Sequence, residues 1–116
     1  VNESTNPDNF LAEWIRQEHD HWVQLGRRAF VTHVVNTCAC FLKDEALIIQ
    51  GDIDFSSVPD RIYLDRLPDS VVVEGHATFS GCASLEALGN TLQVEGNLSF
   101  WNCHVLDTLP LQLEVG

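Results

Sequence analysis

The stretch from Ser70 to Leu109, SVVVEGHATFSGCASLEALGNTLQVEGNLSFWNCHVLDTL, contains nearly the same pattern twice. Glycine, cysteine and leucine return after a constant step of 21 residues. The matched pairs are Gly75 with Gly96, Cys82 with Cys103, Leu85 with Leu106 and Leu88 with Leu109. A short fixed period is typical of repeat proteins, in which each repeat is one structural unit.

Around this stretch, apolar and polar residues alternate with a period of two, which indicates strands with one buried side. The alternation begins at Leu47, Val71, Leu92 and Leu113, so the starts are 24, 21 and 21 residues apart. The extra residues of the first unit fall in SSVPDRIYLDR. We expect each unit to be one coil of a solenoid, with its strand paired to the next at roughly 4.8 Å. The middle of each complete stretch is a glycine that suits a corner or a close backbone contact, namely Gly51, Gly75 and Gly96.

The unit that begins at Leu67 and ends at Leu85 has the form LPxxVxVxGxAxFxxCxxL. It resembles the bacterial leucine-rich repeats of the type LPxxLxVxGxLxLxxCxxLxxLP, and the resemblance covers about residues 47–116. Two departures are Val58, near the cysteine position of the first coil, and Gly89, in place of a proline. The resemblance implies a curved solenoid that binds other proteins through its strand face. In many bacterial effectors such a solenoid follows a helical region.

The first part of the chain predicts two helices with a short link, hence an antiparallel hairpin. Asn6 is a candidate N-cap, Pro7 suits the first helical position, and Gly26 is a candidate stop. A second helix is expected over about residues 28–42, although its β-branched residues also suit a strand. The apolar stripe of the first helix is Phe10, Leu11, Trp14, Ile15, Trp22 and Leu25, and that of the second is Phe30, Val31, Val34, Val35, Cys38, Phe41 and Leu42.

These observations together predict an α+β fold in which an N-terminal helical hairpin caps a short leucine-rich-repeat β-solenoid. The cap is placed at residues 1–46 and the solenoid, of about three and a half coils, at 47–116. The helices are expected to cover the first coil, Leu47–Phe55, because an open solenoid end exposes apolar side chains. At the other end only Leu109, Leu111, Leu113 and Val115 follow the third coil. Three arrangements are open: further repeats, a homodimer through the last coil, or a tail that acts as a lid. We favour the first two.

The chain is strongly acidic, with 17 Asp and Glu against 6 Lys and Arg and a net charge of −11. This balance disfavours nucleic acid and anionic membranes as partners and favours a protein with a basic patch. Residues 47–116 carry ten acids and two bases, so the solenoid is the more acidic part. No stretch has the pattern of a signal peptide or a membrane span. Four irregularly spaced cysteines favour a reducing cytoplasm, and the resemblance adds secretion into a host cell as a second location.

The outward strand positions are the candidate binding surface. Stacking in register predicts the rows Gln50-Glu74-Glu95, Asp52-His76-Asn97, Asp54-Thr78-Ser99 and Ser56-Ser80-Trp101. From these rows we select as partner-binding residues Asp52, Asp54, Glu74, His76, Glu95, Asn97 and Trp101. An exposed tryptophan beside polar groups suits an interface anchor. The alternative is that these are solvated strand positions and that the tryptophan folds over the coil edge.

No residue pattern predicts catalysis, a metal or a cofactor. His19 and His21 point to different sides of a helix, and zinc needs about four converging ligands. Cys82 and Cys103 would lie within disulfide distance, but thiols that fill the core are the favoured interpretation. The main prediction is thus a recognition module and not an enzyme. The alternatives are a substrate-recognition fragment of a larger enzyme, such as an effector ubiquitin ligase, and an acidic mimic of nucleic acid.

Overall fold

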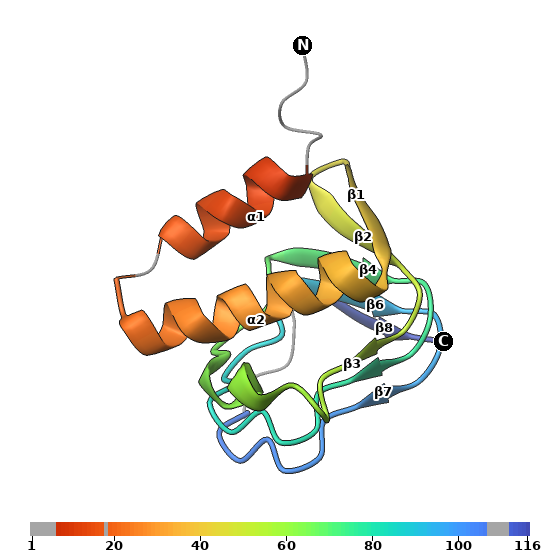
Figure 1. Ribbon diagram of the computed structural model, residues 1–116. Helices are drawn as coiled ribbons and strands as arrows, with labels where there is room; N and C mark the ends of the chain where they lie inside the picture. Colours follow the sequence, from red (N-terminus) through yellow and green to blue (C-terminus); the bar gives the residue numbers. More distant parts are fainter. Residues whose placement is uncertain (1–6, 18, 107–111) are drawn as a thin grey trace.

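The computed structural model describes residues 7–17, 19–106 and 112–116, and the side chains from residue 10 on within these ranges. The fold is α+β: two helices come first, and parallel strands then wind into a β-solenoid of about three turns (Figure 1). The predicted fold class and the order of its parts are therefore confirmed. Three residues used in the predictions lie outside the described ranges, namely Asn6, Leu109 and Leu111.

The two helices have other bounds than those predicted. α1 spans Pro7–Arg16 and α2 spans His21–Thr37. The prediction of one helix that ends near Gly26 and a second over 28–42 is wrong, because a new helix begins after Asp20. The Asp20 carboxylate accepts a hydrogen bond of 2.9 Å from the backbone N–H two residues on. This bond satisfies one of the free donors at the start of α2 and fixes where the helix begins.

Gly26 lies inside α2 because the helix packs very closely on the first coil. The extra residues of that coil form a 3-10 helix, η2 (Pro59–Tyr63), against which α2 lies. A Cβ atom at Gly26 would collide with the backbone of Tyr63 and Leu64. Glycine therefore serves here to bring two backbones together and not to end a helix.

The end of the predicted second helix is a strand. β1 (Ala39–Lys43) follows α2 and pairs antiparallel with β2 (Ala46–Gln50). Its apolar residues lie on both sides of the sheet, since Leu42 is buried and Phe41 is exposed. The division predicted between residues 46 and 47 thus falls inside a β-hairpin, and the segment 1–46 is not wholly helical.

The repeat half forms coils of two strands each. The coils are β2 with β3 (Ile53–Asp54), β4 (Ser70–Val73) with β5 (Ala77–Thr78), and β6 (Thr91–Val94) with β7 (Leu98–Ser99); β8 (Gln112–Val115) begins a fourth. One sheet has the order β1-β2-β4-β6-β8 and the other β3-β5-β7. Successive coils pair in parallel, and the register aligns Leu47, Val71, Leu92 and Leu113. The repeat period predicted from the sequence is therefore the step from coil to coil.

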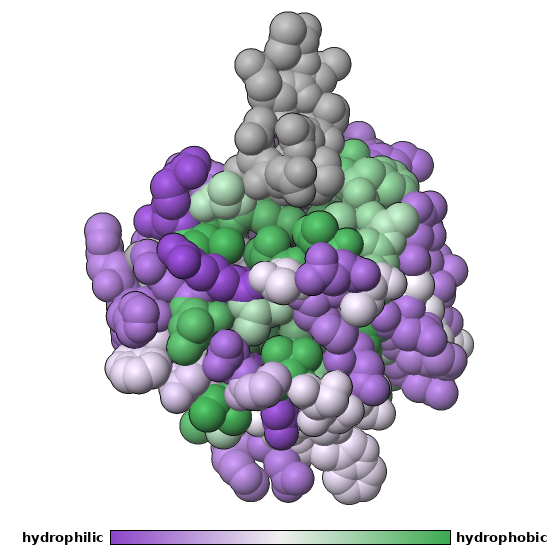
Figure 2. All heavy atoms as spheres, in the orientation of Figure 1, coloured by the Kyte–Doolittle hydropathy of each residue, from purple (hydrophilic) through white to green (hydrophobic). Residues whose placement is uncertain are grey.

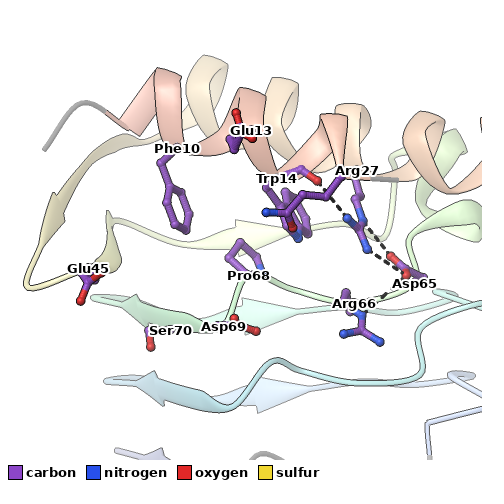
Figure 3. Close-up of a pocket in the computed structure, with 11 residues that line it drawn as sticks. Phe10, Glu13, Trp14, Arg27, Glu45, Asp65, Arg66, Pro68, Asp69 and Ser70 are labelled. Atoms are coloured by element: carbon purple, nitrogen blue, oxygen red, sulfur yellow. Dashed lines mark hydrogen bonds and ion pairs between the residues drawn. The ribbon is translucent and has the colours of Figure 1, made fainter. Parts of the chain in front are cut away.

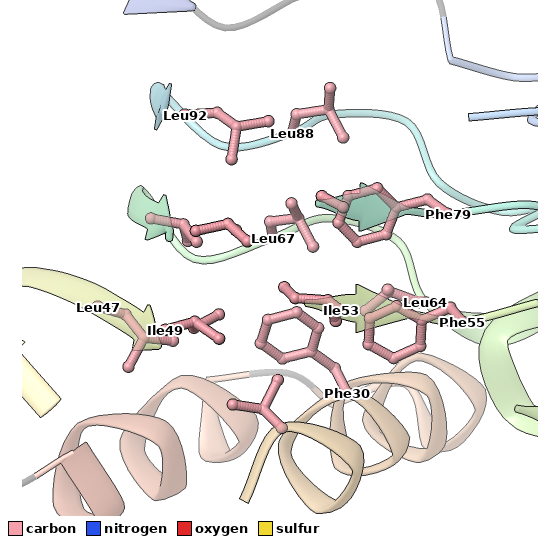
Figure 4. Packing of buried hydrophobic residues seen from close by; sticks show 14 of the residues in the cluster. Phe30, Leu47, Ile49, Ile53, Phe55, Leu64, Leu67, Phe79, Leu88 and Leu92 are labelled. Atoms are coloured by element: carbon pink, nitrogen blue, oxygen red, sulfur yellow. The ribbon is translucent and has the colours of Figure 1, made fainter. Parts of the chain in front are cut away.

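The inward side chains of the coils form ladders that continue into α2 (Figure 4). The rings of Phe30, Phe55 and Phe79 stack in succession, with centroid distances of 5.5 and 5.6 Å. All three are fully buried, so α2 covers the first coil as expected. Phe100 has the equivalent position in the next coil and is 39% exposed. The burial of each ladder residue therefore depends on the layer stacked upon it.

Glycines form the corner between the two sheets in every complete coil. The Gly96 N–H donates a hydrogen bond of 2.9 Å to the carbonyl of Gly75, one coil away. A Cβ at Gly75 would collide with the carboxylate of Asp52 and would lie 2.8 Å from the carbonyl group of Gly51. The corner column thus allows the backbones of successive coils to meet, as the sequence predicted.

Cys82 and Cys103 have equivalent positions in neighbouring coils and are both free thiols. The Cys103 Sγ donates to the carbonyl oxygen of Phe79 at 3.0 Å. Burial raises the pKa of Cys82 to about 12, with a further contribution from the adjacent Cys103. Burial also raises the pKa of Cys103. Both side chains therefore act as neutral, small apolar groups in the stack.

The helical side of the molecule leaves a narrow apolar strip in contact with solvent. Figure 2 shows apolar residues gathered between α1 and the C-terminal part of α2, with hydrophilic residues around them. Val35 is 46% exposed, and Ile15 and Val31 are partly buried against the core. Within the described ranges, neither helix is long and apolar enough to cross a bilayer.

Candidate functional site

All seven residues predicted to contact a partner are exposed. They are Asp52, Asp54, Glu74, His76, Glu95, Asn97 and Trp101. They do not form a single patch. Glu74 and Glu95 directly follow strands of the five-stranded sheet, whereas Asp54 belongs to the three-stranded sheet. Trp101 lies in the turn after β7. The other three residues, Asp52, His76 and Asn97, lie at the corner between the two sheets.

The corner column is held by hydrogen bonds from one coil to the next. The Asp52 Oδ1 accepts from the backbone N–H of His76 at 2.8 Å, and the His76 Nδ1 accepts from the backbone N–H of Asn97 at 2.8 Å. Because Nδ1 is an acceptor, the proton of the neutral imidazole is assigned to Nε2. Asp52 and His76 thus satisfy backbone donors of the following coil, which gives both a structural role.

Asp54 also has a local structural role. Two hydrogen bonds from Ser56 lower the pKa of the Asp54 carboxyl group. The larger effect comes from the Ser56 side chain, and the second from its backbone N–H at 2.8 Å. This arrangement stabilises the charged form at the turn that follows β3. Asp54 therefore orders its own loop, and its charge is partly engaged within the chain.

Glu74 and Glu95 form an uncompensated pair of like charges. The register that pairs Val73 with Val94 places them side by side at the strand spacing, roughly 4.8 Å. In the described part of the chain, neither carboxylate has an ion pair or a hydrogen bond. Like charges in this arrangement destabilise a sheet. The pair is therefore available to a cationic group from outside.

An apolar row on the outer side of the five-stranded sheet was not predicted. The register pairs Phe41 with Ile48 and Ile48 with Val72, and their side chains alternate with those of the inner core. Ile48, in the middle of the row, is only 8% exposed. Phe41 is 37% exposed and Val72 is partly exposed. In the sequence, this row is indicated by the runs LII and VVV, where Ile48 and Val72 are apolar at positions that strict alternation would leave polar. Phe41 was assigned instead to the apolar stripe of a predicted helix, so its position on the sheet was missed.

The apolar row and the acidic pair lie next to each other. Glu74 follows Val72 by two residues on the same side of the sheet, which corresponds to roughly 7 Å along the strand. Protein interfaces commonly combine an apolar centre with a polar rim. We define the outer strand face by five residues, namely Phe41, Ile48, Val72, Glu74 and Glu95.

Trp101 is a separate exposed aromatic group on the other side of the corner. Its side chain is 72% exposed, while its carbonyl oxygen accepts the N–H of Gly81 at 2.7 Å. The alternative in which the indole folds over the coil edge is therefore wrong. Large exposed aromatic side chains are frequent anchors in interfaces.

The histidine segment before α2 has structural contacts. Asp20 caps the helix, and the ring of His21 packs against that of Trp22 with centroids 5.3 Å apart. Among the residues that the structure describes, no group of three or more His, Cys, Asp or Glu side chains could hold a metal ion.

Comparison with known proteins gives no relative from which a role could be transferred. No family model, curated protein or solved structure matches this chain.

Proposed function

We propose that the chain is a protein-recognition module whose outer strand face binds a partner protein that carries a basic patch. The observation that carries the proposal is the position of the apolar row beside Glu74 and Glu95. A partner that brings Lys or Arg to the two carboxylates and an apolar side chain to Phe41 and Val72 would use both features. Binding would relieve the repulsion between the carboxylates, which no basic residue of the described part relieves.

The charge distribution supports a basic partner. Residues 47–116 carry ten acidic and two basic residues, so the solenoid is surrounded by a negative potential. Such a field increases the rate at which a basic protein meets the surface and orients it on approach. We therefore expect association to slow as ionic strength rises.

The resemblance to bacterial leucine-rich repeats supports the same surface. It implies recognition through the strand face. On the same basis, we propose that the chain is part of a bacterial secreted effector. The stacked coils are compatible with a repeat protein. Trp101, in the turn after β7, would be a second anchor for a partner large enough to reach around the corner.

A capture experiment with paired variants tests the proposal. The immobilised wild type is compared with a face variant, Phe41→Ser with Glu95→Lys, and with Trp101→Ala, after circular dichroism and urea unfolding show that each is folded. We expect a protein captured by the wild type to bind the face variant at least about tenfold more weakly. Equal affinity of that protein for wild type and face variant would refute the proposal.

A further inference from the structure

A groove that shares no residue with the outer strand face lies under α1. Figure 3 shows Phe10 and Trp14 projecting from α1 toward Pro68, with Glu45 at one end and Asp65 with Arg66 at the other. The groove has a volume of about 650 Å³, within the usual range of ligand sites. Its walls come from α1, the β1–β2 turn and the segment before β4.

One end of the groove is rigid, and it carries one net positive charge because Arg66 lies 3.7 Å from Asp65, beside the Arg27–Asp65 pair. The Arg27 guanidinium donates to both carboxylate oxygens of Asp65, at 3.0 and 3.1 Å, and to the carbonyl oxygen of Trp14 at 3.0 Å. It also lies 4.9 Å from the centre of the Trp14 ring. The Arg27 and Asp65 side chains are only 6% and 15% exposed. This end therefore holds a fixed wall in which the charges of Arg27 and Asp65 neutralise each other.

The other end of the groove is acidic and open. Glu45 and Asp69 are exposed, and in the described part of the chain their carboxylates have no ion pair or hydrogen bond. Among the described residues, Glu13 on α1 pairs with the exposed Arg16 on its own helix. In Figure 3 the ring of Phe10 lies between Glu45 and Trp14, and Pro68 lies beside Asp69.

We propose that this groove binds an extended segment of a protein partner that carries a lysine or arginine next to an apolar residue. Charge complementarity selects the cation, because Glu45 and Asp69 have no counterion among the residues that the structure describes. The aliphatic stem of a basic side chain can lie along Phe10 and Pro68 while its charged end reaches Glu45 and Asp69. The neighbouring apolar residue would contact Trp14.

A titration with small peptides tests this proposal separately from the outer strand face. The probes are the blocked pentapeptides ALKLA, ALQLA and ALELA, added at millimolar concentration to the ¹⁵N-labelled protein. We expect ALKLA to shift the amide signals of Glu45, Asp69 and Ser70 and the indole signal of Trp14. ALQLA should shift them less, and ALELA should leave them in place. Added salt should weaken the ALKLA effect.

Matched variants give the controls. Glu45→Lys with Asp69→Lys should weaken ALKLA binding about tenfold, since each lost exposed ion pair reduces affinity only modestly. Glu74→Lys with Glu95→Lys changes the net charge by the same amount on the outer strand face and should leave groove binding unchanged. The proposal is overturned if ALKLA gives no shift, if ALELA shifts the same signals equally, or if both double variants weaken binding alike. Shifts confined to Val72, Glu74 and Glu95 would overturn it while leaving the proposed function intact.

Discussion

The phenylalanine ladder makes a quantitative prediction about how the coils stabilise one another. Phenylalanine occupies the same position in two successive coils, as Phe79 and Phe100. Phe79 is 0% exposed, whereas Phe100 is 39% exposed. Phe79→Ala removes a ring that stacks on Phe55 at 5.6 Å and leaves a cavity between two layers. Truncation of a fully buried phenylalanine lowers the free energy of unfolding by about 3–5 kcal/mol.

Phe100→Ala is the matched control. About three-fifths of the surface of the Phe100 residue is buried, and truncation of its side chain opens space to solvent and encloses no cavity. Only the transfer contribution is then lost, which is about 1–2 kcal/mol. Urea unfolding followed by circular dichroism measures both changes. Equal losses for the two variants, or a loss below about 1 kcal/mol for Phe79→Ala, would refute the layered core.

Four other measurements test individual features. Gly75→Ala should lower the free energy of unfolding by about 1–3 kcal/mol, because the new Cβ would lie 2.8 Å from a backbone carbonyl group of the preceding coil; a loss below about 0.5 kcal/mol would contradict the tight corner. Glu95→Gln should raise that free energy by about 0.2–1 kcal/mol at low salt, because it removes a facing like charge; any loss in urea unfolding would show that the carboxylate is compensated. Arg27→Met should cost about 3 kcal/mol, because it leaves the largely buried Asp65 with only the 3.7 Å contact to the exposed Arg66, and Arg27→Met with Asp65→Leu should recover most of it; a double variant as unstable as the single one would contradict the pairing. The buried Cys82 thiol contributes stability that is complete below pH 9.0 and is lost as pH rises toward its folded pKa of about 12. Between pH 8 and pH 11, the free energy of unfolding measured with urea should therefore fall less for Cys82→Ala than for wild type. An identical fall for both would place the thiol outside the core.

The parts of the fold that follow from regular repetition could be predicted from the sequence. A constant step of glycine, cysteine and leucine specifies which residues of successive coils meet, so the register and the glycine corner follow directly. The helix bounds depend on local capping, and the apolar stripe continues past Asp20 without marking the break. β1 was missed because the sequence of its turn, Asp44-Glu45, does not indicate the positive φ angles of 53° and 66° that these residues adopt. Asn-Gly or Asp-Gly usually signals that turn geometry, and neither is present.

The candidate site could be predicted only where alternation decides exposure. Glu74 and Glu95 were found because outward strand positions follow from the period of two. The hydrogen bonds that engage Asp52 and His76 depend on how closely the coils stack, which the sequence does not specify. The groove under α1 combines three distant segments, so no local pattern indicates it.

Hydroxyl-radical footprinting of the chain with its captured partner, read by mass spectrometry, tests the central claim most directly. It reports side-chain exposure, and Phe41, Trp101 and Trp22 are 37%, 72% and 56% exposed in the free chain. Binding on the outer strand face predicts strong protection of Phe41, with additional protection of Trp101 if the partner reaches around the corner. Trp22, on the helical side, should stay unchanged. Protection of Trp22 with Phe41 unaltered would contradict recognition through the strands.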